Sequence, residues 1–587
     1  MKLNIAFLIH ITAGLLASLS SCGGSSTADY LNGNFISGVN DSTPPSIINP
    51  QNHEQIWHCR TTLQWSSKYK AAYYTVDVSE TDDFSSPITG SPFTVNAPAT
   101  SLALTLPDAK TYYWRVCADS TPSNVYGISS FESMDDAVYV YMPASASAPD
   151  NTGMVGNKSK PFQTIRHAVD IADELGISKV KIASRGTDSG GTVAVYGEVV
   201  SVKDGVSLYG GYKGAANGAP DFSETSRSIT ANPTKVQGNY WCTLSSTGTL
   251  YSPTAVEGLY ILGSNVPYTD STLGITNTAA AAAILSNNGV KLTIKNCSIL
   301  SADVMMTGNV TTYGVYTHDA KVSVENCEIQ AGKGDRSRGV GLFATSVNSV
   351  QDSFVRNNII HGADGCTSSI GLEVFGGNLL VANNRIFGQT SNDSGLSIAA
   401  GSCGVYLRSG KMEFFNNIMA GYTCGCVGAS EACITAVFTD NTIVADGTIG
   451  NTTNTAGIYL SGSTTSSCIL TNNIVISYQK GYGIYKASGV WTSIHTYTYF
   501  FGVAGASDSN GWFTIGEGDK ITTEKVISDA NMNVRDYHVL NANTVSIDMG
   551  TGTASSLGLG SYTNRADGVP DTGIVDLGYH YAPCGIQ

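Results

Sequence analysis

A short sequence phrase recurs seven times between Leu292 and Val475, and it constrains the fold more than any other feature of the chain. Each copy alternates apolar and variable residues, continues with two corner residues drawn from Asn, Asp and Cys, and closes on an aliphatic or similar apolar residue. The copies follow one another at roughly 24 to 33 residues, the range that is typical of stacked repeats. The first corner residues are Asn296, Asn326, Asn357, Asn383, Asn416, Asp440 and Asn472.

The alternation within each copy predicts a β-strand with one apolar face. The corner pair predicts a sharp bend, because Asn adopts the left-handed backbone conformation at low cost. A single coil cannot bury its apolar face, but stacked coils bury it against each other, and their asparagines can then form hydrogen bonds along the stack. The repeats therefore predict a parallel β-helix.

From residue 137 to about 535 the chain resembles the right-handed parallel β-helix proteins of the pectin-lyase-like superfamily. Residues 160–176 are similar to the short helix with which such proteins begin. In this segment Ile165, Ala168, Val169, Ala172 and Leu175 form one helical stripe that would close the first coil, and Gly176 would end the helix. The resemblance implies an all-β fold with a right-handed single-stranded parallel β-helix.

The N-terminus predicts export and a lipid anchor. Residues 1–21 have a short basic start and an apolar stretch, and Leu19 to Cys22 form a lipobox. We expect Cys22 to be acylated and to hold the protein on the bacterial envelope, at the outer membrane or the cell surface. Residues 22–43 are rich in Gly, Ser, Asn and Thr and are expected to form a flexible tether.

Residues 44–135 predict a small antiparallel sandwich. The strand patterns resemble a fibronectin type III module, with Trp65 in place of the core tryptophan of that family. Cys59 and Cys117 lie on opposite sides of this pattern, so they form either a disulfide or two buried thiols. We expect residues 136–535 to be the β-helix and residues 536–587 to be a closing segment that covers its last coil.

Composition narrows the possible partners. The net charge of −14 and the absence of a basic stripe argue against nucleic acid as a ligand. Nothing in the sequence indicates a cofactor, and the chain is expected to be a monomer. The expected partners are membrane lipid, through acylated Cys22, and a polysaccharide or another host or envelope macromolecule.

The cysteines of the repeats allow two interpretations. Cys297 and Cys327 occupy the same corner position in consecutive coils, where they form either a disulfide or a ladder of small side chains. Cys424, Cys426 and Cys433 are further disulfide candidates. They lack the Cys-x-x-Cys spacing of structural zinc sites, so we expect no metal there.

A second pattern, Gly followed by an aliphatic and usually an aromatic residue, predicts a row of outward side chains on one sheet. Such rings suit sugar binding, but they can equally stabilise the sheet by packing on one another. The row comprises Tyr316, Phe343, Glu373, Tyr406, Tyr459 and Tyr485.

Glu373 is the only acid of this row. Together with His361, Asp364 and Asp393 in adjacent loops, it is the best candidate for a catalytic or cation-binding group, although a solvated surface acid explains it as simply. The aspartate motifs of galacturonan hydrolases on this fold are absent. The sequence therefore favours a binding or scaffold protein of the cell envelope, with a lyase or hydrolase acting on an acidic polysaccharide as the alternative.

Overall fold

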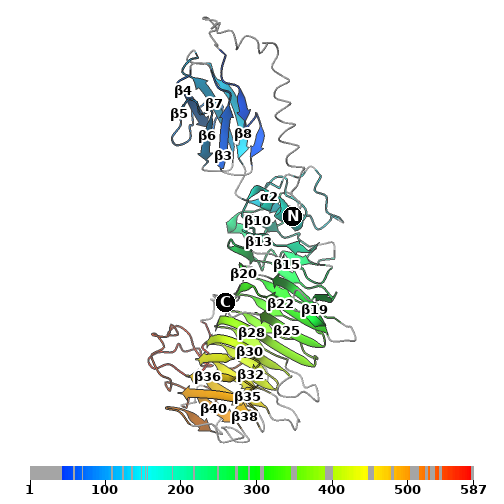
Figure 1. Ribbon diagram of the computed structural model, residues 1–587, viewed down its shortest axis with the longest axis vertical. Helices are drawn as coiled ribbons and strands as arrows, with labels where there is room; N and C mark the ends of the chain where they lie inside the picture. Colours follow the sequence, from blue (N-terminus) through cyan, green and yellow to red (C-terminus); the bar gives the residue numbers. More distant parts are fainter. Residues whose placement is uncertain are drawn as a thin grey trace. The chain divides into compact units, whose positions relative to one another are not determined.

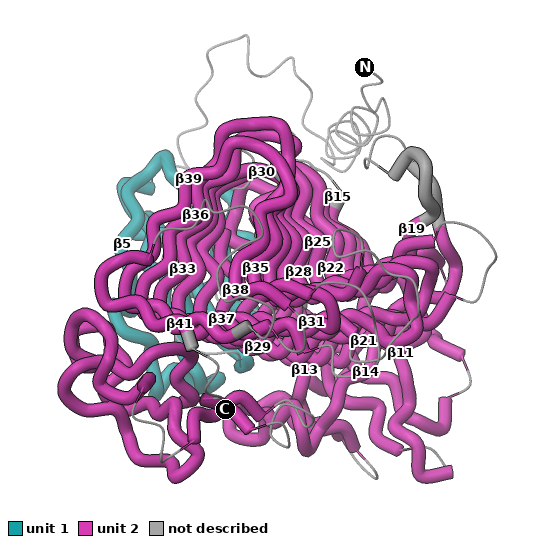
Figure 2. The backbone as a smooth tube through the Cα atoms, turned by 90° about the horizontal axis from the view of Figure 1, so that it is seen from below, with its two compact units in different colours: residues 1–134 teal, residues 135–587 magenta. Residues whose placement is uncertain are grey.

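The computed structural model of the chain divides into two compact units, residues 1–134 and 135–587 (Figures 1 and 2). It describes residues 43–582 with short gaps, so the predicted signal peptide, Cys22 and residues 22–42 of the predicted tether lie outside the described residues. The described part contains no helix long and apolar enough to cross a membrane. The gaps are residues 57–59, 69–70, 107–109, 122–124, 134–136, 147, 153, 155, 188–189, 216–218, 239, 248–249, 271–274, 288–290, 305–309, 345–352, 390–400, 447–454, 478–480, 503–514, 523–525, 529–535 and 541–544.

The first unit is a sandwich of a three-stranded and a five-stranded sheet. Trp65 and Trp114 lie in its core with ring centroids 6.5 Å apart, so Trp65 is a core residue as the sequence predicts. The smaller sheet contains β1 (Ile47–Asn49), β3 (Arg60–Trp65) and β6 (Ser101–Thr105). The larger contains β2 (Glu54–Ile56), β8 (Gly127–Ser133), β7 (Thr111–Ala118), β4 (Tyr73–Ser79) and β5 (Phe93–Asn96).

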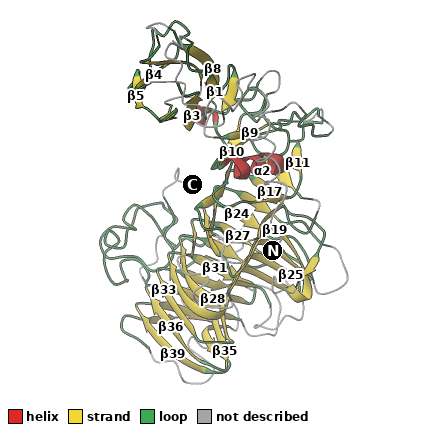
Figure 3. Ribbon diagram, turned by 45° about the horizontal axis from the view of Figure 1, so that its top comes forward, coloured by secondary structure: helices red, strands yellow, loops and turns green. Residues whose placement is uncertain are grey.

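The second unit is a parallel β-helix with three faces, which we call sheets I, II and III. Each regular coil passes from sheet I to sheet II, turns at the predicted corner into sheet III, and returns to sheet I one coil further on. Figure 3 shows the strands of this unit in yellow. The prediction of an all-β chain with a sandwich followed by a parallel β-helix is confirmed.

Each of the three sheets is built from strands, or parts of strands, of successive coils. Sheet I contains β12 (Val200–Ser201), β15 (Leu244–Thr247), β19 (Ile275–Asn287), β22 (Val310–His318), β25 (Arg336–Phe343), the first parts of β28 (Ser368–Ala382) and β30 (Cys403–Phe415), β32 (Cys424–Ser430), β35 (Ala456–Gly462) and β38 (Tyr482–Lys486), and β18 (Tyr268–Asp270) pairs antiparallel with β19.

Sheet II contains β9 (Val138–Val140), β10 (Lys179–Ala183), β13 (Ser207–Tyr212), β16 (Thr254–Glu257), β20 (Lys291–Lys295), β23 (Lys321–Glu325), β26 (Ser353–Arg356), the later parts of β28 and β30, β33 (Ile434–Thr439), β36 (Thr465–Thr471) and β39 (Val490–Thr496). Sheet III contains β11 (Val195–Gly197), β14 (Lys235–Gln237), β17 (Tyr260–Leu262), β21 (Ser298–Leu300), β24 (Glu328–Gln330), β27 (Ile359–His361), β29 (Arg385–Phe387), β31 (Ile418–Gly421), β34 (Thr442–Ala445), β37 (Ile474–Ser477), β40 (Tyr499–Gly502) and β41 (Lys520–Thr522).

The helix α2 (Ile165–Leu175) packs against β9, β10 and β12 at the first coils of the β-helix. Four residues of the predicted stripe are buried, whereas Leu175 is 36 % exposed. Gly176 ends the helix with φ 68°, a left-handed conformation that favours glycine. Glu198 accepts hydrogen bonds from the backbone N–H groups of Ile165 and Arg166, and it thereby caps the N-terminus of the helix.

The two residues of each corner have different roles, one in the turn of the backbone and one in hydrogen bonding. The first residue of each pair has φ between 51° and 58°, as in Asn416 and Asn472. The second residue is buried and forms a hydrogen-bonded ladder, in which the backbone N–H of each coil donates to the side-chain oxygen one coil further on at 2.8 to 3.0 Å. The ladder residues are Cys297, Cys327, Asn358, Asn384, Asn417, Asn441 and Asn473.

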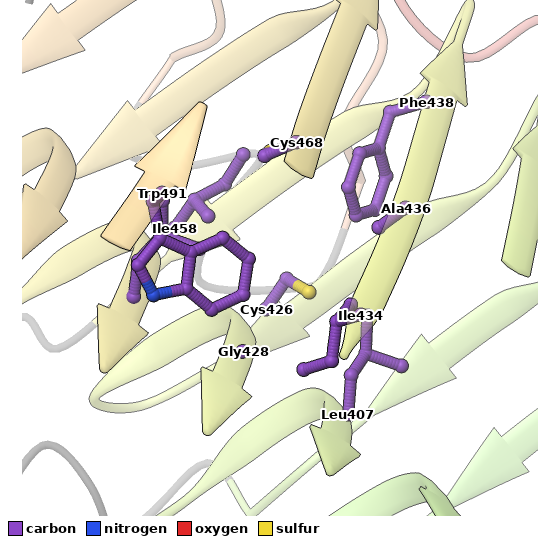
Figure 4. Close-up of a pocket in the computed structure, with 10 residues that line it drawn as sticks. Leu407, Cys426, Gly428, Ile434, Ala436, Phe438, Ile458, Cys468 and Trp491 are labelled. Carbon is purple, nitrogen blue, oxygen red and sulfur yellow. The ribbon is translucent and has the colours of Figure 1, made fainter. Parts of the chain in front are cut away.

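The interior between sheets I and II is closely packed. Figure 4 shows an apolar cavity between these sheets, of about 10 Å³, which is room for about one water molecule. Trp491 covers it, and its indole N–H donates to the carbonyl of Ser461 at 3.2 Å. A Cβ on Gly428 would lie only 2.8 Å from the Trp491 ring, so the glycine leaves room for the indole.

The closing segment lies along the flank of the β-helix. All residues of β31, β34 and β37 are buried, whereas β21 and β24 have exposed outward residues. Val539, Leu577 and Tyr579 of the closing segment pack on the outer side of sheet III. The segment therefore covers several coils from the side, rather than only the last coil.

Two corner asparagines hold the closing segment. Asn416 donates to the carbonyl of His580 and accepts from its N–H at 3.0 and 2.6 Å. Asn472 makes the same pair of bonds with Thr551 at 3.1 and 2.8 Å. The residues that turn each coil thus also bind the segment that covers sheet III.

Candidate functional site

Five of the six residues predicted to share a row on sheet I do share it. Tyr316, Glu373, Tyr406, Tyr459 and Tyr485 follow one another in register, with Gly341 and Val427 in the two intervening coils. The row is not uniformly exposed: Tyr316 and Glu373 are 3 % and 5 % exposed, and the later tyrosines are half-buried.

Phe343 lies two positions beyond the predicted place and pairs with His318 and Phe375. Gly341 takes its position because the rings on either side need the space: a Cβ there would lie 2.7 Å from Tyr313 and 2.8 Å from Phe343. The Phe343 ring packs on Tyr316 with centroids 5.3 Å apart. The sequence pattern can start at Gly339 or at Gly341, since both precede an apolar residue, and the structure corresponds to the start at Gly339.

Glu373 is buried in an ion pair. The Arg338 Nε donates to its Oε2 at 2.6 Å, and both side chains are less than a tenth exposed. The Arg338 Nη1 also donates to the carbonyls of Ser337 and Ser368. On the other side of Glu373, the Arg408 Nη1 lies 3.6 Å from its Oε1. The sequence analysis left open a solvated surface acid at Glu373, and the structure shows that Glu373 and its partner Arg338 are both buried instead.

Burial and charge shift the pKa values around this pair. For Arg338 the largest effect is burial, which would lower its pKa, but the charges of Glu373 and Tyr313 and the hydrogen bond to Glu373 together outweigh it, and the pKa is raised. Burial raises the pKa of Tyr406 to about 12, with smaller contributions from Cys403 and Glu373. At neutral pH the tyrosine hydroxyl is therefore protonated and can donate a hydrogen bond.

The accessible part of the row lies toward the C-terminal coils. Tyr459 and Tyr485 stack with centroids 5.6 Å apart and ring planes 17° apart. Beside them Arg408 donates to both carboxylate oxygens of Glu431 at 2.8 Å, and its guanidinium lies 4.8 Å above the Phe375 ring. We call this surface, formed by Tyr406, Arg408, Glu431, Tyr459 and Tyr485, the tyrosine face.

The loop candidates do not gather around Glu373. His361 stacks on Phe387 of sheet III with ring centroids 4.9 Å apart. Asp364 is exposed and lines an open groove of about 470 Å³ with Asp303 and Lys333, at the turns that follow sheet III. Asp393 lies outside the described residues.

The ten described cysteines are free thiols. Cys297 and Cys327 occupy the first two positions of the hydrogen-bonded ladder, and the Cys297 N–H donates to the Cys327 sulfur at 3.4 Å. Cys424 packs on the outer side of β32, while Cys426 of the same strand lines the interior cavity, so they face opposite sides. Cys433 is exposed, and Cys117 is a free thiol, while Cys59 lies outside the described residues.

The sequence analysis missed two groups. Arg338 had no signal in the repeat pattern, because the register pairs it with Ile370 and only its side chain reaches Glu373. The acids Asp440, Asp548, Asp571 and Asp576 gather around His580 in the closing segment, and no local pattern connects them. The His580 Nε2 lies 2.8 Å from a carboxylate oxygen of Asp571.

Comparison with protein-family models, with curated proteins and with solved structures finds no match for this chain.

Proposed function

We propose that this chain is a lipid-anchored protein of the bacterial cell envelope whose tyrosine face binds a polysaccharide. The observation that carries the proposal is the row of partly exposed Tyr406, Tyr459 and Tyr485, which shares a face with the ion pair of Arg408 and Glu431. Aromatic rings with hydroxyl groups offer apolar area and hydrogen bonds together, which is the combination that sugars need.

The charges of the face favour a neutral polysaccharide. Arg338 and Arg408 are balanced by Glu373 and Glu431, all within one connected group of ion pairs. An acidic polymer would have to compete with these glutamates for the same guanidinium groups. Sugar hydroxyls, in contrast, can accept from Arg408 and donate to Glu431 without breaking the charge balance.

The same geometry argues against Glu373 as a catalytic acid. Glycoside cleavage needs a carboxyl group that reaches the substrate. The Glu373 carboxylate is instead buried and engaged by Arg338 and Arg408. Binding without cleavage is therefore the function that this site supports best.

The anchor is the second part of the proposal, and it depends on the lipobox that ends at Cys22. Labelling with a fatty-acid analogue should modify the wild-type chain at Cys22. Cys22→Ala should abolish the label and release the protein from membranes. A labelled Cys22→Ala variant would contradict the anchor without touching the binding proposal.

Binding is tested with the full chain in detergent against a panel of neutral and acidic polysaccharides. Tyr406→Ala and Tyr459→Ala should each weaken binding about three- to tenfold, the range expected for one aromatic contact. Tyr251→Ala is the matched control, because Tyr251 is 77 % exposed and lies outside the face. Equal affinity of all three variants would refute the proposed face.

Product analysis separates binding from cleavage in the same samples. We expect neither new reducing ends nor unsaturated products. Turnover that disappears in a folded Glu373→Gln variant would establish the lyase or hydrolase alternative instead.

A further inference from the structure

The closing segment brings together three carboxylates that are distant in the sequence. One oxygen from each of Asp548, Asp571 and Asp576 lies within 4.8 Å of the others. Backbone hydrogen bonds hold them in place: the Asp548 N–H donates to Asp576 at 2.7 Å, and the Asp576 N–H donates to Asp571 at 2.8 Å. Asp571 and Asp576 are 4 % and 3 % exposed, while Asp548 is exposed and opens the group to solvent.

A fourth acid belongs to the β-helix itself. Asp440 occupies the corner position that Asn occupies in the other six repeats. It is completely buried, and neither carboxylate oxygen has a hydrogen-bond partner. Its charge interacts with Asp571 and with His580, so this unsatisfied carboxylate belongs to the same group.

The group carries more negative than positive charge. Both ring nitrogens of His580 lie 2.8 Å from oxygens that can only accept, the carbonyl of Gly578 and the carboxylate of Asp571. Arg565 is held by Asp567, and its charge also interacts with Asp576 and Asp548, so four carboxyl groups face His580 and Arg565.

We propose that Asp548, Asp571 and Asp576 bind a divalent cation of the calcium type, which holds the closing segment on the flank of the β-helix. Calcium binds carboxylate oxygens at about 2.3 to 2.6 Å in flexible geometry, so oxygens up to about 4.8 Å apart can share one ion. Magnesium keeps several waters and usually takes only one or two carboxylates, so it suits this group less well.

Two observations support a cation at this place. The Asp440 carboxylate is completely buried without a hydrogen-bond partner, and its charge interacts with Asp571 of the group. A bound divalent ion would offset the repulsion among these carboxylates. The group also lies between the two places where Asn416 and Asn472 form hydrogen bonds with the closing segment. A bound ion there would join this segment to the coils.

The test uses the full chain in detergent, freed of divalent ions with a chelator and titrated with calcium chloride. Calorimetry reports binding, and proteolysis of the closing segment reports its docking. At a calcium concentration 100 times the dissociation constant, cleavage through the undocked state should slow about a hundredfold. Neither readout depends on polysaccharide binding, so failure here leaves the proposed function intact.

Asp548→Asn removes the exposed ligand and should weaken calcium binding about tenfold or more. Asp567→Asn is the matched control in the same segment, because Asp567 is not one of the three ligands. Asp440→Asn restores the residue of the other corners, and it should stabilise the calcium-free closing segment while lowering its response to calcium.

Three results would overturn the proposal. The wild-type chain fails to bind calcium, Asp548→Asn binds it as tightly as the wild type, or the closing segment responds to pH but not to calcium. The last result would mean that protons, and not a metal ion, neutralise the group.

Discussion

Replacing Glu373 by glutamine should destabilise the coils around it severely. The change leaves the Arg338 guanidinium buried beside a neutral amide. Removing one partner of a buried ion pair costs about 3 to 5 kcal/mol, because the remaining charge stays desolvated and uncompensated. The contact to Arg408 adds little, since that side chain is 30 % exposed and such pairs contribute about 0.2 to 1 kcal/mol.

Hydrogen exchange of the amides in β25 and β28 measures this cost locally, which suits an array of repeats that can open in parts. A loss of about 3 to 5 kcal/mol corresponds to roughly 150- to 5,000-fold faster exchange through local opening. Amides of the sandwich, which is a separate compact unit, provide the internal reference. Glu413→Gln on the neighbouring strand β30 is the matched control and should change little, because Glu413 pairs with Lys411 at the surface.

The double variant Arg338→Met with Glu373→Leu separates charge from packing. It removes both charges, so its exchange should return close to the wild-type rate. Two results would refute the reasoning: Glu373→Gln exchanging like Glu413→Gln, or the double variant exchanging faster than Glu373→Gln. The experiment is also a folding control for the product analysis, because lost turnover in Glu373→Gln indicates catalysis only where the coils remain folded.

Three further predictions concern the β-helix. Asn417→Ala should cost about 2 to 4 kcal/mol, because the side chain makes five hydrogen bonds of about 1 kcal/mol each within the ladder; a thermal melting point equal to that of the wild type would contradict this. Gly404→Ala should cost about 1 to 3 kcal/mol or more, because its Cβ would lie 2.7 to 3.0 Å from backbone atoms of neighbouring strands, whereas Gly197→Ala meets open space and should melt normally. Iodoacetamide at pH 8 should modify exposed Cys433 but not buried Cys403, whose pKa burial raises to about 12; mass spectrometry checks this, and labelling in guanidinium is the control.

The corner phrase predicted sheets II and III well, because its signal is local. A residue such as Asn296 must adopt a positive φ, and its neighbours must alternate between the core and solvent. Sheet I was less predictable. Its glycine column keeps the backbones close, but glycine also recurs two positions later at Gly341, and so the frame of Phe343 was placed two residues away.

No local sequence pattern indicates the buried ion pair of Arg338 and Glu373 or the position of the closing segment. Arg338 follows a run of charged residues that is typical of a solvated turn, and only the structure shows Glu373 as its partner. The contact between Asn416 and His580 joins residues 164 positions apart. No periodicity connects such residues, so the location of the closing segment and its group of carboxylates could come only from the structure.

The location of the closing segment decides which face can bind a ligand. It occupies the outer side of sheet III over β31, β34 and β37, where every residue is buried. The outer side of sheet II carries ion pairs across its strands, such as Arg356 with Glu325, and these charges are already neutralised and solvated. Among the described residues, sheet I combines partly exposed aromatic rings with a charged pair on adjacent strands. We therefore propose that a polymer lying along the β-helix binds at the tyrosine face, while the closing segment keeps part of sheet III covered.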